Sequence, residues 1–205
     1  SNDPVIEEKS LELMKKCIEL AQDLGVRTIQ LAGYDVYYEE KSPQTRQRFI
    51  KNLRKACDWA EEAQVILAIE IMDDPFINSI EKYLAVEKVI DSPYLFVYPD
   101  IGNVSAWHND VYSEFYLGHH AIAALHLKDT YAVTESSKGQ FRDVTFGQGC
   151  VKWEEAFDIL KQTNYNGPFL IEMWSENCET VEETREAIQE AQAFLYPLIK
   201  KAGLM

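Results

Sequence analysis

The sequence predicts an α/β fold built on a parallel sheet of about five strands, and three observations lead to this prediction. Short apolar segments alternate with amphipathic helical segments along the chain. The apolar segments are near-continuous runs, as expected for parallel strands that are covered on both faces. Each connection between them is long enough for the crossover helix that parallel neighbours require. A chain of 205 residues has the usual size of one domain, so we predict a single domain over residues 1–205.

The first element is a predicted helix that begins at Asp3-Pro4 and ends at Gly25. Asp3 suits the N-cap, Pro4 suits the first helical position, and Gly25 suits the C-terminal end. Ser1 and Asn2 resemble the remnant of a cleaved tag, and no fold argument rests on them. The buried stripe of this helix is formed by Leu11, Met14, Ile18 and Ala21.

Five strands follow, each with a helix after it. The predicted strands are 27–33, 64–72, 94–100, 121–129 and 169–174. The predicted helices after them are 42–63, 79–90, 111–117, 153–163 and 180–202, with a long loop between residues 129 and 153. A closed (β/α)8 barrel needs eight strands. The chain is therefore either an open doubly wound sheet or the last five units of such a barrel.

Charge and composition exclude several classes of protein. Twenty Lys and Arg against 34 Asp and Glu give a net charge of −14, which opposes binding to nucleic acid phosphates. No apolar run reaches the roughly 18 residues of a membrane span, and the stretch VILAIEIM is interrupted by Glu70. The four cysteines show no CxxC spacing, so we expect them to be buried small side chains in a reducing compartment. We find no secretory leader and expect a cytoplasmic protein.

One ionisable residue stands at or near the carboxyl end of each of four successive strands: Glu70, Asp100, His126 and Glu172. Parallel strands bring these ends to one edge of the sheet, so the four side chains should meet. Each alone has a simpler interpretation, an ion pair for a Glu or a hydrogen-bonded core histidine for His126. Together, three carboxylates and one imidazole favour a site for manganese, cobalt, zinc or magnesium.

Three further features of the chain are open to two interpretations. Arg142, in the long loop, is either an anion contact or a surface partner of Asp143. The segment Gly147-Gln148-Gly149 is either a phosphate cradle or an ordinary turn, and the turn is favoured. Lys128-Asp129 is compatible with a structural ion pair.

Several motifs together resemble one known family. They are IQLAGYDVYYEE, AIEIMD with Asn78-Ser79, YPDIGNVSAW, LHLKDT, GQFRDVTFGQG and FLIEMW. From about residue 10 onward the chain closely resembles the bacterial L-ribulose-5-phosphate 3-epimerases, also called L-xylulose-5-phosphate 3-epimerases. These are xylose-isomerase-like TIM barrels of L-ascorbate and related pentose utilisation. The resemblance implies a partial (β/α)8 barrel, namely its C-terminal five βα units, with the family's first three units not included.

The resemblance also implies a site and a reaction. It assigns one divalent metal, with zinc or manganese favoured and cobalt or magnesium also suitable, to Glu70, Asp100, His126 and Glu172. The two glutamates would also be the acid–base pair that inverts C3 of a ketopentose 5-phosphate through an enediolate. Related ketose 3-epimerases have a histidine three positions after the metal-binding aspartate, where this chain has Asn103. They also have an arginine soon after the metal-binding histidine, and Arg142 is its counterpart across a longer loop.

Other functions fit less well. An aldose–ketose isomerase on the same scaffold would need a second metal and more ligands. An apurinic-site endonuclease would need more than the four histidines present, and the negative charge opposes DNA. A metal-binding but catalytically incomplete barrel is a further alternative. The strands 27–33 and 169–174 would be open edges, so we expect the chain not to close into a monomeric barrel and to form a homodimer.

Overall fold

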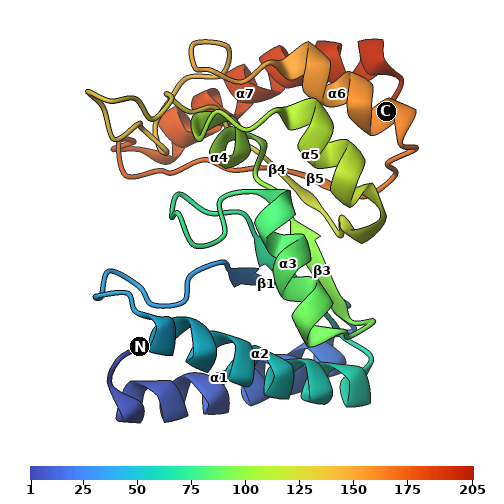
Figure 1. Ribbon diagram of the computed structural model, residues 1–205. Helices are drawn as coiled ribbons and strands as arrows, with labels where there is room; N and C mark the ends of the chain where they lie inside the picture. The colour runs from blue at the N-terminus through green and yellow to red at the C-terminus, as the bar shows by residue number, and fades with distance from the viewer.

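The computed structural model describes residues 1–205 and places seven α-helices around five short parallel strands (Figure 1). The strands are β1 (Thr28–Ala32), β2 (Ile66–Glu70), β3 (Leu95–Tyr98), β4 (Leu125–Leu127) and β5 (Phe169–Ile171). The helices are α1 (Pro4–Leu24), α2 (Pro43–Ala63), α3 (Ile80–Ile90), α4 (Ile101–Ala106), α5 (Val111–Gly118), α6 (Trp153–Gln162) and α7 (Val181–Ala202), with one 3-10 turn at His119–Ala121.

The strands follow one another in chain order. β1, β2 and β3 form one parallel sheet, and β4 and β5 form another. Single parallel bridges, Val97 to Ile122 and Asp100 to His126, connect the two sheets. Figure 1 shows the resulting layers, with α1 and α2 at one end of the molecule and α6 and α7 at the other. The predicted fold class, a partial (β/α)8 barrel with five parallel strands, is confirmed.

The helix ends follow from local chemistry. The Asp3 carboxylate accepts the N–H of Val5 at 2.8 Å, which satisfies a donor that the first turn of α1 leaves free. Gly25 ends α1 in the left-handed conformation, with φ of 69°, where a glycine has no steric cost. Ser42 and Thr45 form a reciprocal capping box at α2, and Ser79 caps α3.

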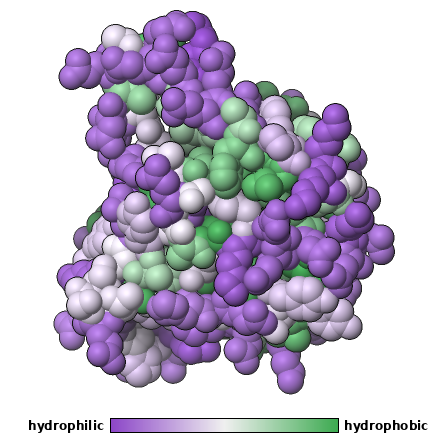
Figure 2. Space-filling view, turned by 90° about the horizontal axis from the view of Figure 1, so that it is seen from above, coloured by the Kyte–Doolittle hydropathy of each residue, from purple (hydrophilic) through white to green (hydrophobic).

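Burial differs between the inner and outer strands. β2, β3 and β4 are almost entirely buried, and the largest fully buried side chains include Tyr83, Phe115 and Phe157. β1 and β5 each pair on one side only and are partly exposed, as expected for open edges. Figure 2 shows a largely hydrophilic face with apolar side chains gathered near its middle, so part of the apolar surface is uncovered.

Three details differ from the sequence predictions. The sequence did not predict α4, a helix of six residues that begins because the Asp100 side chain accepts the N–H of Asn103 at 2.8 Å. The predicted strands 121–129 and 169–174 shorten to three residues each, because pairing between β4 and β5 covers only that length. All four cysteines are free, but only Cys57 is buried, whereas Cys17 on the outer side of α1 is exposed.

No helix in residues 1–205 combines the length and the apolar character that spanning a membrane requires.

Candidate metal centre

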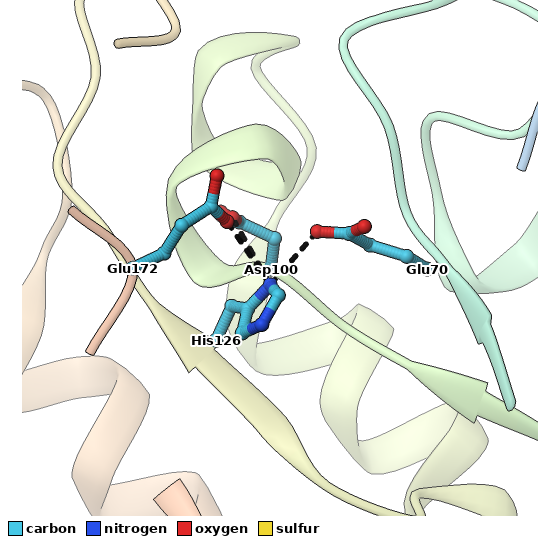
Figure 3. Close-up of side chains that lie close together, drawn as sticks. All are labelled: Glu70, Asp100, His126 and Glu172. Carbon is cyan, nitrogen blue, oxygen red and sulfur yellow. Dashed lines mark hydrogen bonds and ion pairs between the residues drawn. The ribbon is translucent and has the colours of Figure 1, made fainter. Parts of the chain in front are cut away.

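The structure brings the four predicted site residues together at the carboxyl end of the strands. Glu70 ends β2, Asp100 caps α4 just after β3, His126 is the middle residue of β4, and Glu172 follows β5. One ligand atom from each residue lies within 4.8 Å of the other three. Figure 3 shows Glu70 and Glu172 reaching toward His126 from opposite sides, with Asp100 between them. The sheet alone therefore gathers groups that are up to 102 positions apart in the chain, which is the separation of residues 70 and 172.

Burial makes this cluster costly unless positive charge compensates it. The exposed fractions are 6% for Glu70, 0% for Asp100 and 9% for His126. Two carboxylate oxygens, Asp100 Oδ2 and Glu172 Oε2, are buried without a well-aligned hydrogen bond, and each is reached by an ion-pair contact at 3.0 Å, from Lys128 and His126 respectively. Buried charges of one sign are tolerated when they are paired or coordinate a metal. The ligand set and the two oxygens without an aligned hydrogen bond thus fit a divalent cation, since carboxylate and imidazole groups are ligands for zinc, manganese and magnesium.

One oxygen of each carboxylate accepts a hydrogen bond from a residue outside the cluster. Glu70 Oε2 accepts the side-chain amide N–H of Gln30 at 2.6 Å. Asp100 Oδ1 accepts the backbone N–H of Asn103, and Glu172 Oε1 accepts the Lys128 ammonium at 3.1 Å. Partners of this kind orient ligands around a metal and are a common second layer of such sites. Sequence reasoning missed both Gln30 and Lys128, although a polar residue inside the apolar segment RTIQLAG was a usable signal.

The second oxygen of each carboxylate faces the imidazole of His126. Its Nδ1 lies 2.8 Å from Glu70 Oε1, 3.0 Å from Glu172 Oε2 and 4.0 Å from Asp100 Oδ2. Nδ1 is thus the ring nitrogen that would ligate an ion shared with the carboxylates. The tilted ring of Tyr98 packs against the imidazole, with ring centroids 4.6 Å apart.

The pKa values reflect burial and close charges. Burial raises the pKa of Asp100 to about 8. Burial lowers the pKa of His126, but the contacts with Glu172 and Glu70 outweigh this effect and raise it to about 9. Burial also raises the pKa of Glu172, yet the neighbouring His126 and Lys128 hold it well below its usual range. The ionised form of the buried carboxyl groups is therefore favoured by positive charge at the centre of the cluster.

A cavity of about 470 Å³ opens over the cluster. Asn103 and Arg142, the two residues predicted to contact substrate, both line it. The Asn103 amide donates to the Ile71 carbonyl at 2.9 Å, while its Oδ1 is buried without a donor. The Arg142 guanidinium lies 3.8 Å from the centroid of the Trp174 ring and forms no ion pair with Asp143. Their role in binding substrate stays a prediction, but their positions agree with it.

The segment 147–149 is a turn, as favoured from the sequence, and the anion that its amides bind is Asp129 of the same chain. The N–H groups of Gly147 and Gly149 donate to Asp129 Oδ2 at 2.8 and 3.2 Å. A Cβ at Gly149 would lie 2.0 Å from Asp129 Oδ1, so only glycine allows this approach. Asp129 therefore anchors the long loop to β4, and it does not pair with Lys128, whose ammonium contacts Asp100 and Glu172 instead.

The fold and the site define a partial α/β barrel with a candidate metal centre and a cavity above it. The chain belongs to the xylose isomerase-like TIM barrel family, whose sequence model matches residues 1–198. Among its relatives is SgbU of Haemophilus influenzae, a candidate L-ribulose-5-phosphate 3-epimerase, which is 52% identical over all 205 residues and 71% of its own length. The L-ribulose-5-phosphate 3-epimerase UlaE of Escherichia coli O157:H7 is 45% identical over the whole chain and 69% of its own length.

A solved structure supports the fold independently. The structure of an L-ribulose 3-epimerase matches 98% of this chain and 71% of its own chain, with a TM-score of 0.77. Its sequence is 19% identical to this one, so this likeness concerns the fold.

Proposed function

We propose that this site inverts C3 of a ketopentose 5-phosphate, interconverting L-ribulose 5-phosphate and L-xylulose 5-phosphate by removal and return of a proton. The observation that carries the proposal is that Glu70 and Glu172 reach toward His126 from opposite sides of the candidate metal centre (Figure 3). Epimerisation needs a base on one face of C3 and an acid on the other face. Relatives at 45–52% identity that are named for this reaction support the same substrate class.

The chain's own residues would perform the proton transfers. In Glu70 and Glu172 one oxygen is held by Gln30 or Lys128, and the other faces the centre of the cluster, 2.8 and 3.0 Å from His126 Nδ1. One glutamate takes the C3 proton, and the other delivers a proton to the opposite face. Glu70, Asp100, His126 and Glu172 would hold the divalent cation, which would supply Lewis-acid stabilisation of the negative charge that proton removal creates. Zinc or manganese is favoured for this role, and cobalt or magnesium is also suitable.

Two residues of the cavity wall would orient the sugar phosphate. Asn103 Oδ1 is a buried acceptor without a donor, so a substrate hydroxyl would satisfy it. Arg142 lies against Trp174 with its guanidinium free of ion pairs, which suits a phosphate. The homodimer and the cytoplasmic location stay predictions, and the unpaired edges of β1 and β5 support the homodimer.

The proposal is tested by incubating the manganese-loaded chain with L-ribulose 5-phosphate in D₂O, with UlaE of Escherichia coli O157:H7 as the reference enzyme. We expect the L-xylulose 5-phosphate epimer to form and deuterium to enter C3, because a carboxylate exchanges its proton with solvent. Formation of an aldose without deuterium would favour the aldose–ketose isomerase. Metal binding without any turnover would identify the chain as a catalytically incomplete barrel.

Substitution of Arg142 tests the phosphate contact. We expect Arg142→Leu to raise KM for L-ribulose 5-phosphate by about 10- to 100-fold, the usual range for a lost charge-assisted hydrogen bond. Turnover of unphosphorylated L-ribulose should be unchanged. Arg185→Leu is the matched control, since Arg185 lies exposed on α7 and pairs with Glu182. An equal loss with both substrates would show that Arg142 has a structural role only.

A further inference from the structure

Lys128 is a buried cation that the proposed reaction does not use. It directly follows β4, and its exposed fraction is 7%. Its Nζ lies 3.0 Å from Asp100 Oδ2 and 3.1 Å from Glu172 Oε1. Burial of an ammonium group is costly unless it is well paired, so these two contacts explain why the side chain turns inward. Both partners are among the four residues of the candidate metal centre.

The formal charges of the candidate metal centre indicate how Lys128 would affect a bound ion. Glu70, Asp100 and Glu172 contribute three negative charges, and Lys128 contributes one positive charge. A neutral His126 ligand would leave a net charge of two negative units. A divalent cation would neutralise this charge completely, whereas without Lys128 one negative unit would remain beside the ion. Because charges at this separation interact strongly in a buried site, Lys128 must affect how tightly an ion is held.

We propose that Lys128 is a positioning residue of the metal centre that sets its affinity for divalent cations. Without an ion, its ammonium contacts both Asp100 and Glu172 and holds them beside each other. When an ion binds, the same positive charge repels it and keeps its affinity moderate. This inference rests on the metal site of the proposed function, but it is independent of whether the site epimerises a sugar.

The test compares Lys128→Met with the unsubstituted chain in Mn²⁺ titration calorimetry and in thermal unfolding with and without Mn²⁺. We expect Lys128→Met to bind Mn²⁺ about tenfold more tightly or better, because a repelling charge is removed. After chelator treatment, the Tm of Lys128→Met should be lower than that of the unsubstituted chain. When both proteins are loaded with Mn²⁺, this difference in Tm should be much smaller. Lys128→Arg keeps the charge and should bind Mn²⁺ within about threefold of the unsubstituted chain.

The control variant is Lys82→Met, which changes the net charge equally. The Lys82 ammonium contacts only the Pro75 carbonyl and Asn78 Oδ1, so its removal should leave Mn²⁺ affinity unchanged. If Lys128→Met does not fold, Lys128→Gln replaces it with the same expectation, since it keeps a donor and loses the charge. Unchanged or weaker Mn²⁺ binding in the neutral Lys128 variants would overturn the proposal, as would an equal loss of Tm with and without Mn²⁺.

Discussion

We expect Glu70→Gln and Glu172→Gln each to abolish the proposed epimerisation while the chain remains folded. An amide has nearly the shape of a carboxylate but cannot accept the C3 proton, so one face of the substrate loses its acid–base group. Loss of one such group lowers the rate by roughly 10²–10⁴-fold, and here each substitution also removes a metal ligand. The measurement is the initial rate of C3 inversion followed by NMR, with circular dichroism to confirm that the fold is retained.

The matched control is Glu154→Gln, since Glu154 is exposed on α6 and pairs only with Lys201. It should retain the full rate. Deuterium incorporation adds a second readout, because a variant with one remaining glutamate can still exchange the C3 proton of one epimer without completing inversion. If either glutamine variant retained more than about a tenth of the rate, the two-base mechanism would be wrong.

We expect removal of divalent ions by a chelator to eliminate turnover and lower Tm, and Mn²⁺ or Zn²⁺ to restore both. An ion that binds only the folded chain stabilises it by about 2.7 kcal/mol at a concentration of 100 Kd. For a chain of this size, this corresponds to a Tm shift of about 5–10 °C. An ion that compensates the buried carboxyl groups of Glu70, Asp100 and Glu172 acts in the same direction.

The control for chelation is His126→Ala, which removes the only nitrogen ligand of the centre. Its Tm should respond much less to added Mn²⁺, which separates binding at this centre from binding of ions elsewhere on the acidic surface. Full activity after exhaustive chelation would contradict the metal dependence.

The parts of the structure that depend on local patterns were predictable. Residues 65–71 form a largely buried run that is apolar except for Glu70, and Ser42, Ser79 and Gly25 mark helix ends, so their elements lie where the sequence places them. The four site residues were also predictable, because the carboxyl ends of parallel strands always share one edge. That rule needs only the order of the strands and no coordinates.

The parts that depend on distant partners were not predictable from one sequence. Gln30 and Lys128 contact glutamates that are 40 and 44 residues away, and nothing in their neighbourhood identifies those partners. Asp129 next to Lys128 suggested an ion pair, but the backbone of residues 147–149 takes the carboxylate and leaves the lysine to the metal centre. The helix α4 is too short for a periodic apolar pattern, and its start depends on the Asp100 cap.

The division of the sheet into two parts has a consequence for the cooperativity of the molecule. β1–β3 and β4–β5 are joined in the sheet only by single bridges, so this junction has few backbone hydrogen bonds of its own. Glu70 and Asp100 belong to the first part, whereas His126 and Glu172 belong to the second. A cation bound by all four would couple the opening of the two parts, so that neither could unfold without breaking coordination bonds. The geometry of the site and the cooperative unfolding of the two parts of the sheet would then depend on the same ion.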